Sequence, residues 1–135
     1  MSLYCFGKLL PPVDVEGLLA GFDCRVSLPE SDDIAVLENE PSLVGEGSFF
    51  LICDSEGGPD ATRLWNEATE GEVELEGIIQ RILDAPDVEI GSIAFVDGGI
   101  EDVIEGSKSE CLERIRKLLS RPWDTIGNPL FVWKN

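Results

Sequence analysis

An unbroken apolar run at residues 48–54, SFFLICD, constrains the fold of this chain more than any other segment. Gly47 precedes the run and the turn-forming residues SEGGPD follow it. A strand that faces water on one side alternates apolar with polar residues, whereas a short run without alternation is typical of burial on both faces. Residues 48–54 therefore predict a central strand of a sheet.

Five other segments are rich in β-branched or aromatic residues and end at turn-forming residues, which predicts strands. They are residues 3–9, CRVSL (24–28), DIAVLE (33–38), EIGSIAFV (89–96) and NPLFVWKN (128–135). We expect CRVSL and DIAVLE to pair as a hairpin across the intervening PESDD.

Two longer segments carry the apolar stripe of an amphipathic helix. The stripe of the first is Leu75, Ile78, Ile79, Ile82 and Leu83, and that of the second is Cys111, Leu112, Ile115, Leu118 and Leu119. A capping-box pair precedes each stripe, Thr69 with Glu72 and Ser107 with Glu110. Shorter helices are expected in VDVEGLLAGF (13–22) and in ATRLWNEA (61–68), the latter with Asp60 as N-cap.

Strands and helices mix without regular alternation, which favours an α+β fold over an α/β fold. We expect one domain over residues 1–135, with a mostly antiparallel sheet of about five to six strands and three to four helices packed on one face. Hydrophobic residues make up 43% of the chain and mean hydropathy is +0.03, which argues against disorder. No apolar run approaches the roughly 20 residues that a membrane-spanning helix needs, and the N-terminus lacks the pattern of a signal peptide, so we expect a cytoplasmic protein.

The four cysteines are far apart in the sequence, with no CxxC pair and no histidine in the chain. This excludes the usual zinc spacings. Each of Cys5, Cys53 and Cys111 has apolar neighbours. We expect Cys5, Cys24, Cys53 and Cys111 to be buried free thiols, since disulfides are uncommon without secretion.

Charge is distributed unevenly along the chain, whose net charge is -17. Residues 111–135 hold five cations and two acids, or +3, and residues 1–110 hold five cations and 25 acids, or -20. Helix electrostatics accounts for the basic stretch, because cations near a helix C-terminus complement the macrodipole. Pairs at i,i+4, Glu110 with Arg114 and Glu113 with Lys117, add support. We therefore expect no nucleic-acid partner.

Two acidic clusters are candidates for binding a partner. The first is Glu67, Glu70, Glu72, Glu74 and Glu76, and the second is Asp97, Glu101, Asp102 and Glu105 in the loop expected after residues 89–96. Trp65 lies beside the first cluster and would be a binding hot spot if its ring were partly exposed. The alternatives are a core tryptophan and acids that serve as a solvated surface.

Several classes of enzyme are excluded by composition. A chain without histidine cannot form a Ser–His–Asp or Cys–His site, and no nucleotide-binding glycine motif is present. DGGIEDVIEG (97–106) lacks the ligand spacing of a calcium-binding EF-hand loop. Adjacent acids such as Asp32–Asp33 and Glu101–Asp102 are expected by chance among 27 acidic residues. We expect no catalysis, no metal and no cofactor.

Three functions are compatible with these observations. The first is an inhibitor that neutralises a basic protein such as a toxin or nuclease; the chain resembles bacterial immunity proteins in size and charge only. The second is an adaptor or subunit that binds a partner through apolar anchors. The third is a protein with a weak carboxylate–metal site. The first is our prediction, with a basic protein as partner and with no nucleic acid or membrane involved.

Overall fold

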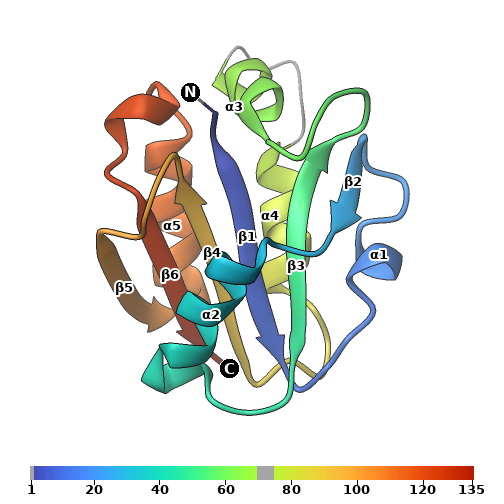
Figure 1. The fold of residues 1–135 in the computed structure, drawn as a ribbon, viewed down its shortest axis with the longest axis vertical. Coiled ribbons are helices and arrows are strands. Elements are labelled where there is room, and N and C mark those ends of the chain that lie inside the picture. The colour runs from blue at the N-terminus through green and yellow to red at the C-terminus, as the bar shows by residue number, and fades with distance from the viewer. Residues whose placement is uncertain (1, 70–74) are drawn as a thin grey trace.

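The sheet has six strands in the order β2-β3-β1-β4-β6-β5 in the computed structural model, which describes residues 2–69 and 75–135 (Figure 1). All neighbouring strands are antiparallel except β5 and β6, which are parallel. The predicted α+β fold with a mostly antiparallel sheet is confirmed. The strands are β1 (Tyr4–Leu10), β2 (Cys24–Ser27), β3 (Ser48–Asp54), β4 (Ile90–Val96), β5 (Asp102–Ser107) and β6 (Pro129–Lys134).

Helices cover both faces of the sheet, not one face as the sequence predicted. The helices are α1 (Val15–Leu18), α2 (Ser31–Asn39), α3 (Thr62–Thr69), α4 (Leu75–Leu83) and α5 (Lys108–Leu118), with 3-10 turns η1 (Pro41–Leu43) and η2 (Trp123–Thr125). In Figure 1, α4 and α5 lie behind the sheet and α2 crosses in front of it. We call the side covered by α2 and η1 the front face, and the opposite side the back face.

The back face carries the larger core. Side chains of α1, α3, α4 and α5 pack there against alternate residues of the strands, among them Cys5, Phe50, Ile93 and Phe131. All five residues of the predicted stripe on α4 are buried, and Ser107 with Glu110 forms a complete capping box at the start of α5. Burial of an aliphatic or aromatic side chain stabilises the fold by about 1.5–3 kcal/mol. The two amphipathic helices are thus correctly predicted in position and in buried face.

The front face has a smaller core, and the segment that covers it, α2 with η1, contributes few buried side chains. Leu37 of α2 and Leu43 of η1 are fully buried against Phe6, Leu51 and other strand residues. Ile34, one turn before Leu37, is half-buried, whereas Val36 is 48% exposed. The predicted hairpin of CRVSL with DIAVLE is therefore wrong. DIAVLE forms α2 because a helix buries Ile34 and Leu37 together at i,i+3, and β2 pairs with β3 instead.

Strand β5 was not predicted, because its sequence, DVIEGS, was interpreted as an acidic loop. It lies beside β6 and is joined to it through α5. Parallel neighbours require a long crossover connection, usually a helix, so β5, α5 and β6 form a β-α-β unit. The edge position explains the weak signal, since most of β5 is exposed and its side chains show little hydrophobic alternation.

Lys8 holds the covering segment on the front face. Its side chain is on β1, yet the residue is only 3% exposed. The Lys8 ammonium donates to the carbonyl oxygens of Leu43 at 2.7 Å and Gly45 at 2.6 Å, and lies over the ring of Phe49. A buried charge must be hydrogen-bonded, and no other side chain in the described part of the protein donates to these carbonyls. The lysine therefore fixes the end of η1 to the centre of the sheet.

We predict that Lys8→Met destabilises the protein by about 1–3 kcal/mol, because the buried Leu43 carbonyl and the partly buried Gly45 carbonyl lose a charged donor. Urea unfolding measures the free energy, and amide hydrogen exchange reports whether α2 opens first. Lys134→Met is the matched control, since Lys134 is exposed, and should change the free energy by less than about 0.5 kcal/mol. Equal effects of the two substitutions would contradict a holding role for Lys8.

Candidate functional site

The described members of the first predicted cluster are already paired with cations. Glu67 forms a two-oxygen ion pair with Arg63 at 2.8 Å, and Glu76 pairs with Arg116. Glu70, Glu72 and Glu74 lie outside the residues that the structure describes. The paired acids have a compensated charge, so they contribute little to a field that attracts a basic partner.

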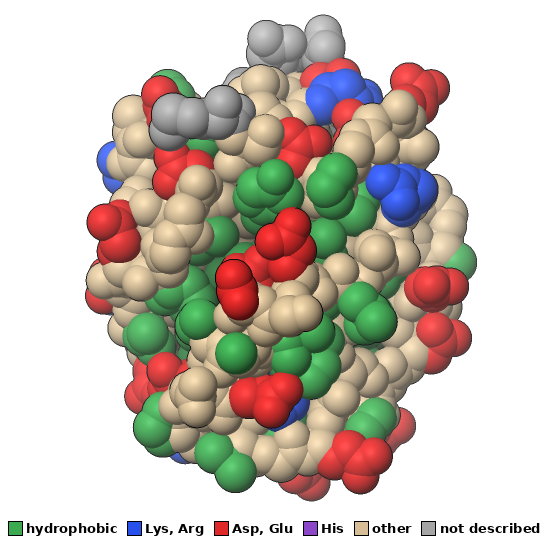
Figure 2. Space-filling view, in the orientation of Figure 1, with side chains coloured by type: hydrophobic (Ala, Val, Ile, Leu, Met, Phe, Trp, Pro, Cys, Tyr) green, Lys and Arg blue, Asp and Glu red, His purple; other side chains and the backbone are tan. Residues whose placement is uncertain are grey.

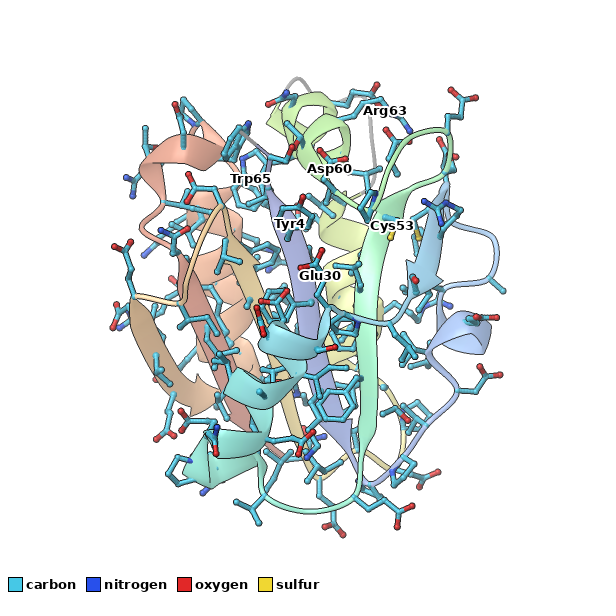
Figure 3. All side chains as sticks on the ribbon, in the orientation of Figure 1. Tyr4, Glu30, Cys53, Asp60, Arg63 and Trp65 are labelled. Atoms are coloured by element: carbon cyan, nitrogen blue, oxygen red, sulfur yellow. The ribbon has the colours of Figure 1, made fainter. Side chains whose placement is uncertain are left out.

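Arg63 joins α3 to the end of β3 (Figure 3). Its guanidinium donates to both carboxylate oxygens of the largely buried Asp54, at 2.5 and 2.6 Å, and lies 3.8 Å from Asp23. Hydrogen bonding to Arg63 lowers the pKa of Asp54, so the ionised pair contributes stability above the carboxyl's unfolded pKa that is lost as pH falls through the folded pKa. This network has a structural role.

Trp65 is a core residue. It is 0% exposed, its ring packs edge-on against Phe95, and its indole N–H donates to the Arg121 carbonyl at 2.9 Å. Trp133 is equally buried, and Trp123 is half-buried against the same core. Trp65 therefore cannot be the exposed hot spot that was considered, and the core alternative is correct.

The second predicted cluster is divided between a loop and an edge strand. Asp97 and Glu101 lie near Asn128, whose side chain accepts from the Asp97 backbone N–H at 2.8 Å and donates to the Glu101 carboxylate at 2.6 Å. Asp102 and Glu105 are on β5, contrary to the predicted loop. Within residues 2–69 and 75–135, none of these four acids forms an ion pair, so their charge is uncompensated.

Helix α2 brings a further set of acids to the front face that sequence reasoning did not select. Glu30, Asp32 and Glu38 are exposed and Asp33 is half-buried. Their signal was present in the sequence: nine acids and no lysine or arginine lie between Arg25 and Arg63. Figure 2 shows acidic side chains across this side of the molecule, with basic side chains few and mostly toward its periphery.

A hydrogen bond connects one acid of β5 to the α2 segment. The Ser42 hydroxyl of η1 donates to the Glu105 carboxylate at 2.5 Å, across 63 positions of sequence. Edge strand β5 and helix α2 therefore belong to one continuous surface. We call this surface the acidic face and define it by the following residues: Glu30, Asp32, Asp33, Glu38 and Glu105. Asp102 is three positions from Glu105 on β5 and so faces the other side of the sheet, as does Ile104, which packs against the back core.

Three exposed aliphatic side chains belong to α2 or its flanking segments. Leu28 is 69% exposed, Val36 48% and Val44 71%, in a chain whose other large apolar residues are mostly buried. Single exposed aliphatic residues are common on protein surfaces. Here they accompany an uncompensated acidic surface, which combines steering charge with groups that a partner could bury.

The ionised form of Asp33 is disfavoured in the folded protein. Burial raises the pKa of Asp33, and the neighbouring carboxylates of Glu30 and Asp32 raise it further. Within the part of the chain that the structure describes, no cation forms an ion pair with this carboxylate. The first turn of α2 thus concentrates negative charge at some cost in stability.

Thiol and metal chemistry find little support in the described residues. The four cysteines are free, as predicted, and all but the half-buried Cys24 are buried. Burial raises the pKa of Cys5, Cys24 and Cys53, and that of Cys111 to about 11, which disfavours the reactive thiolate. Within residues 2–69 and 75–135, no group of three acidic or thiol side chains could hold a metal ion, and no helix could cross a membrane.

Comparison with known proteins gives no assignment. No protein-family model, no curated protein and no solved structure matches this chain. We therefore infer a function from the geometry and electrostatics of the molecule itself.

We predict that Asp33→Asn raises the unfolding midpoint at pH 7, because it removes a carboxylate whose charged form is disfavoured by folding. The folded pKa lies above the unfolded one, so the stability advantage of the variant should shrink as pH falls through the folded pKa and vanish below the unfolded pKa. Thermal unfolding between pH 3 and pH 7 measures this difference.

Asp32→Asn is the matched control on the same helical turn, because Asp32 is exposed. It should be neutral or slightly destabilising at pH 7, since an exposed acid in the first turn favours the helix dipole. A stabilisation by Asp32→Asn as large as that by Asp33→Asn would show that the effect comes from net charge alone.

Proposed function

We propose that the protein is a non-catalytic inhibitor of the immunity type, which binds a basic protein and masks its active surface. The partner is a cationic protein such as a toxin or nuclease, and the binding surface is the acidic face. The observation that carries the proposal is the concentration of unpaired acids around α2 and β5, together with exposed Leu28, Val36 and Val44.

Charge separation within the fold supports this assignment. Basic side chains of α5 pair with acids of the helical layer: Arg116 with Glu76, and Lys108 with Asp84 at 3.8 Å. Of the cations in β1 and β2, Lys8 is buried and Arg25 donates to three backbone carbonyls. No cation of the described residues pairs with the acids of the acidic face, so their charge is free to accelerate encounter with a basic protein.

The aliphatic side chains supply a second contribution to binding. Electrostatic attraction between exposed charges raises the association rate more than the final affinity, and it weakens with salt. Burial of a few apolar side chains within a ring of polar contacts slows dissociation. Val36 projects from the middle of α2, between the acids of its first turn and Glu38, and so has the position of such an anchor.

The test compares capture by the immobilised natural chain with capture by two variants that match each other in net charge. The first variant carries Glu30→Gln, Asp32→Asn and Glu38→Gln, and the second carries Asp84→Asn, Asp87→Asn and Glu89→Gln at the turn after α4. Lysate of the source organism is applied at low salt, washed at high salt, and the retained proteins are identified. Co-expression then shows whether the captured protein inhibits growth and whether this chain relieves the inhibition.

We predict that one stoichiometric basic protein is retained by the natural chain and by the turn variant. Its association rate with the α2 variant should fall about tenfold at low salt, with a smaller salt dependence. Retention of only salt-labile, substoichiometric proteins would remove the inhibitor proposal. A salt-insensitive partner held equally by all three proteins would favour the adaptor alternative.

A further inference from the structure

The outer edge of β5 is an open strand edge on the acidic face. The sheet ends at β5, and no strand among the described residues pairs with its far side. Its six residues are mostly exposed, including Val103 at 41%. An edge strand presents unpaired backbone N–H and C=O groups at alternate positions, which form a template for another strand.

The protection usual for strand edges is only partly present here. The sequence of β5, DVIEGS, contains neither proline nor lysine, the residues that commonly prevent pairing. Its charged residues, Asp102 and Glu105, are both acidic. Two copies of this edge would place acids against acids, which disfavours self-association, whereas a basic strand would find opposite charges.

A hollow beside β5 provides space for a side chain of an added strand. It has a volume of about 360 Å³ and is lined by Glu105, Gly106, Ser107, Val132 and Lys134. Val132 belongs to the front core, so the hollow opens on the front face. Val132 offers it an apolar wall and Glu105 a carboxylate. Recognition by strand addition uses this combination, with backbone hydrogen bonds for affinity and side-chain pockets for specificity.

The other sheet edge fits a basic strand less well. Strand β2 has four residues, and its only charged side chain is that of Arg25. The Arg25 guanidinium donates to the carbonyls of Asp54, Gly57 and Gly58 along the end of the neighbouring strand. Charge complementarity therefore selects β5 as the edge for a cationic segment.

We infer that a basic partner binds by adding an extended segment, in which lysine or arginine alternates with aliphatic residues, as a seventh strand beside β5. This inference rests on the proposed function, because it specifies how the cationic partner is held. Backbone hydrogen bonds form along Asp102–Ser107. The basic side chains face the front, where one meets Glu105 and lays its alkyl stem in the hollow lined by Val132. The aliphatic side chains face the back, beside the half-buried Ile104.

The probe is a blocked octapeptide of alternating lysine and valine, titrated into the full chain. A second peptide of the same sequence has every backbone amide N-methylated, which keeps all charges and removes the hydrogen-bond donors. Affinity is measured by calorimetry, and amide hydrogen exchange of residues 102–107 is followed by NMR.

We predict that the N-methylated peptide binds at least about tenfold more weakly, the equivalent of one or two hydrogen bonds. Only the parent peptide should slow exchange of alternate β5 amides. Glu105→Lys should weaken binding of the parent by about tenfold. Glu16→Lys, an equal change of charge on exposed α1 near the opposite edge, should change it by less than about twofold.

Equal affinity of the two peptides, or unchanged exchange across 102–107, would overturn strand addition and leave only attraction between charges. In that case the proposed function stands if capture of a basic protein still depends on Glu30, Asp32 and Glu38. Loss of that dependence, with β5 still protected by the peptide, would instead remove the inhibitor proposal and retain the strand-addition site.

Discussion

The position of the acidic face depends on the burial of one lysine. The front of the sheet is covered by a segment with two fully buried anchors, Leu37 and Leu43, and the Lys8 ammonium fixes its end through two carbonyl oxygens. Hydrogen bonds from a charged donor are about twice as strong as those between neutral groups. Lys8 also holds a basic side chain inside the layer, so that the surface above it remains acidic.

The same segregation of charge explains how the fold tolerates its net charge of -17. Acids that would repel one another near the helical layer are paired there, as Glu76 is with Arg116 and Glu113 with Lys117. The conflict remains at α2, where burial raises the pKa of Asp33 and the neighbouring carboxylates of Glu30 and Asp32 raise it further. Removing this repulsion between carboxylates would stabilise the fold. It is retained at the surface that we propose as the binding site.

Sequence patterns predicted the elements whose signals are local. The stripes and the capping box of α5, the strand at residues 48–54 and the free cysteines are all found as expected. DIAVLE was misassigned because Ile34 and Val36 alternate with other residues as in a strand. Its helix buries only Leu37 and, in part, Ile34 one turn earlier. β5 was missed because β6, the strand that it pairs with, follows in the sequence only after α5, so no local pattern links the two strands.

The acidic face could not be assembled from sequence because its parts meet through contacts between distant residues. Lys8 reaches Leu43 across 35 positions, and Ser42 reaches Glu105 across 63. The contact between Ser42 and Glu105 also affects how a partner could bind. A carboxylate held by a hydroxyl keeps its charge but loses mobility, so Glu105 is oriented before any partner arrives. A rigid acid at a strand edge, next to an apolar hollow, lowers the conformational entropy that binding must overcome. This preorganisation distinguishes Glu105 from the described acids of the α2 segment, Glu30, Asp32, Asp33 and Glu38, to which no side chain of the described residues donates a hydrogen bond. Those charges can steer a partner without defining its register.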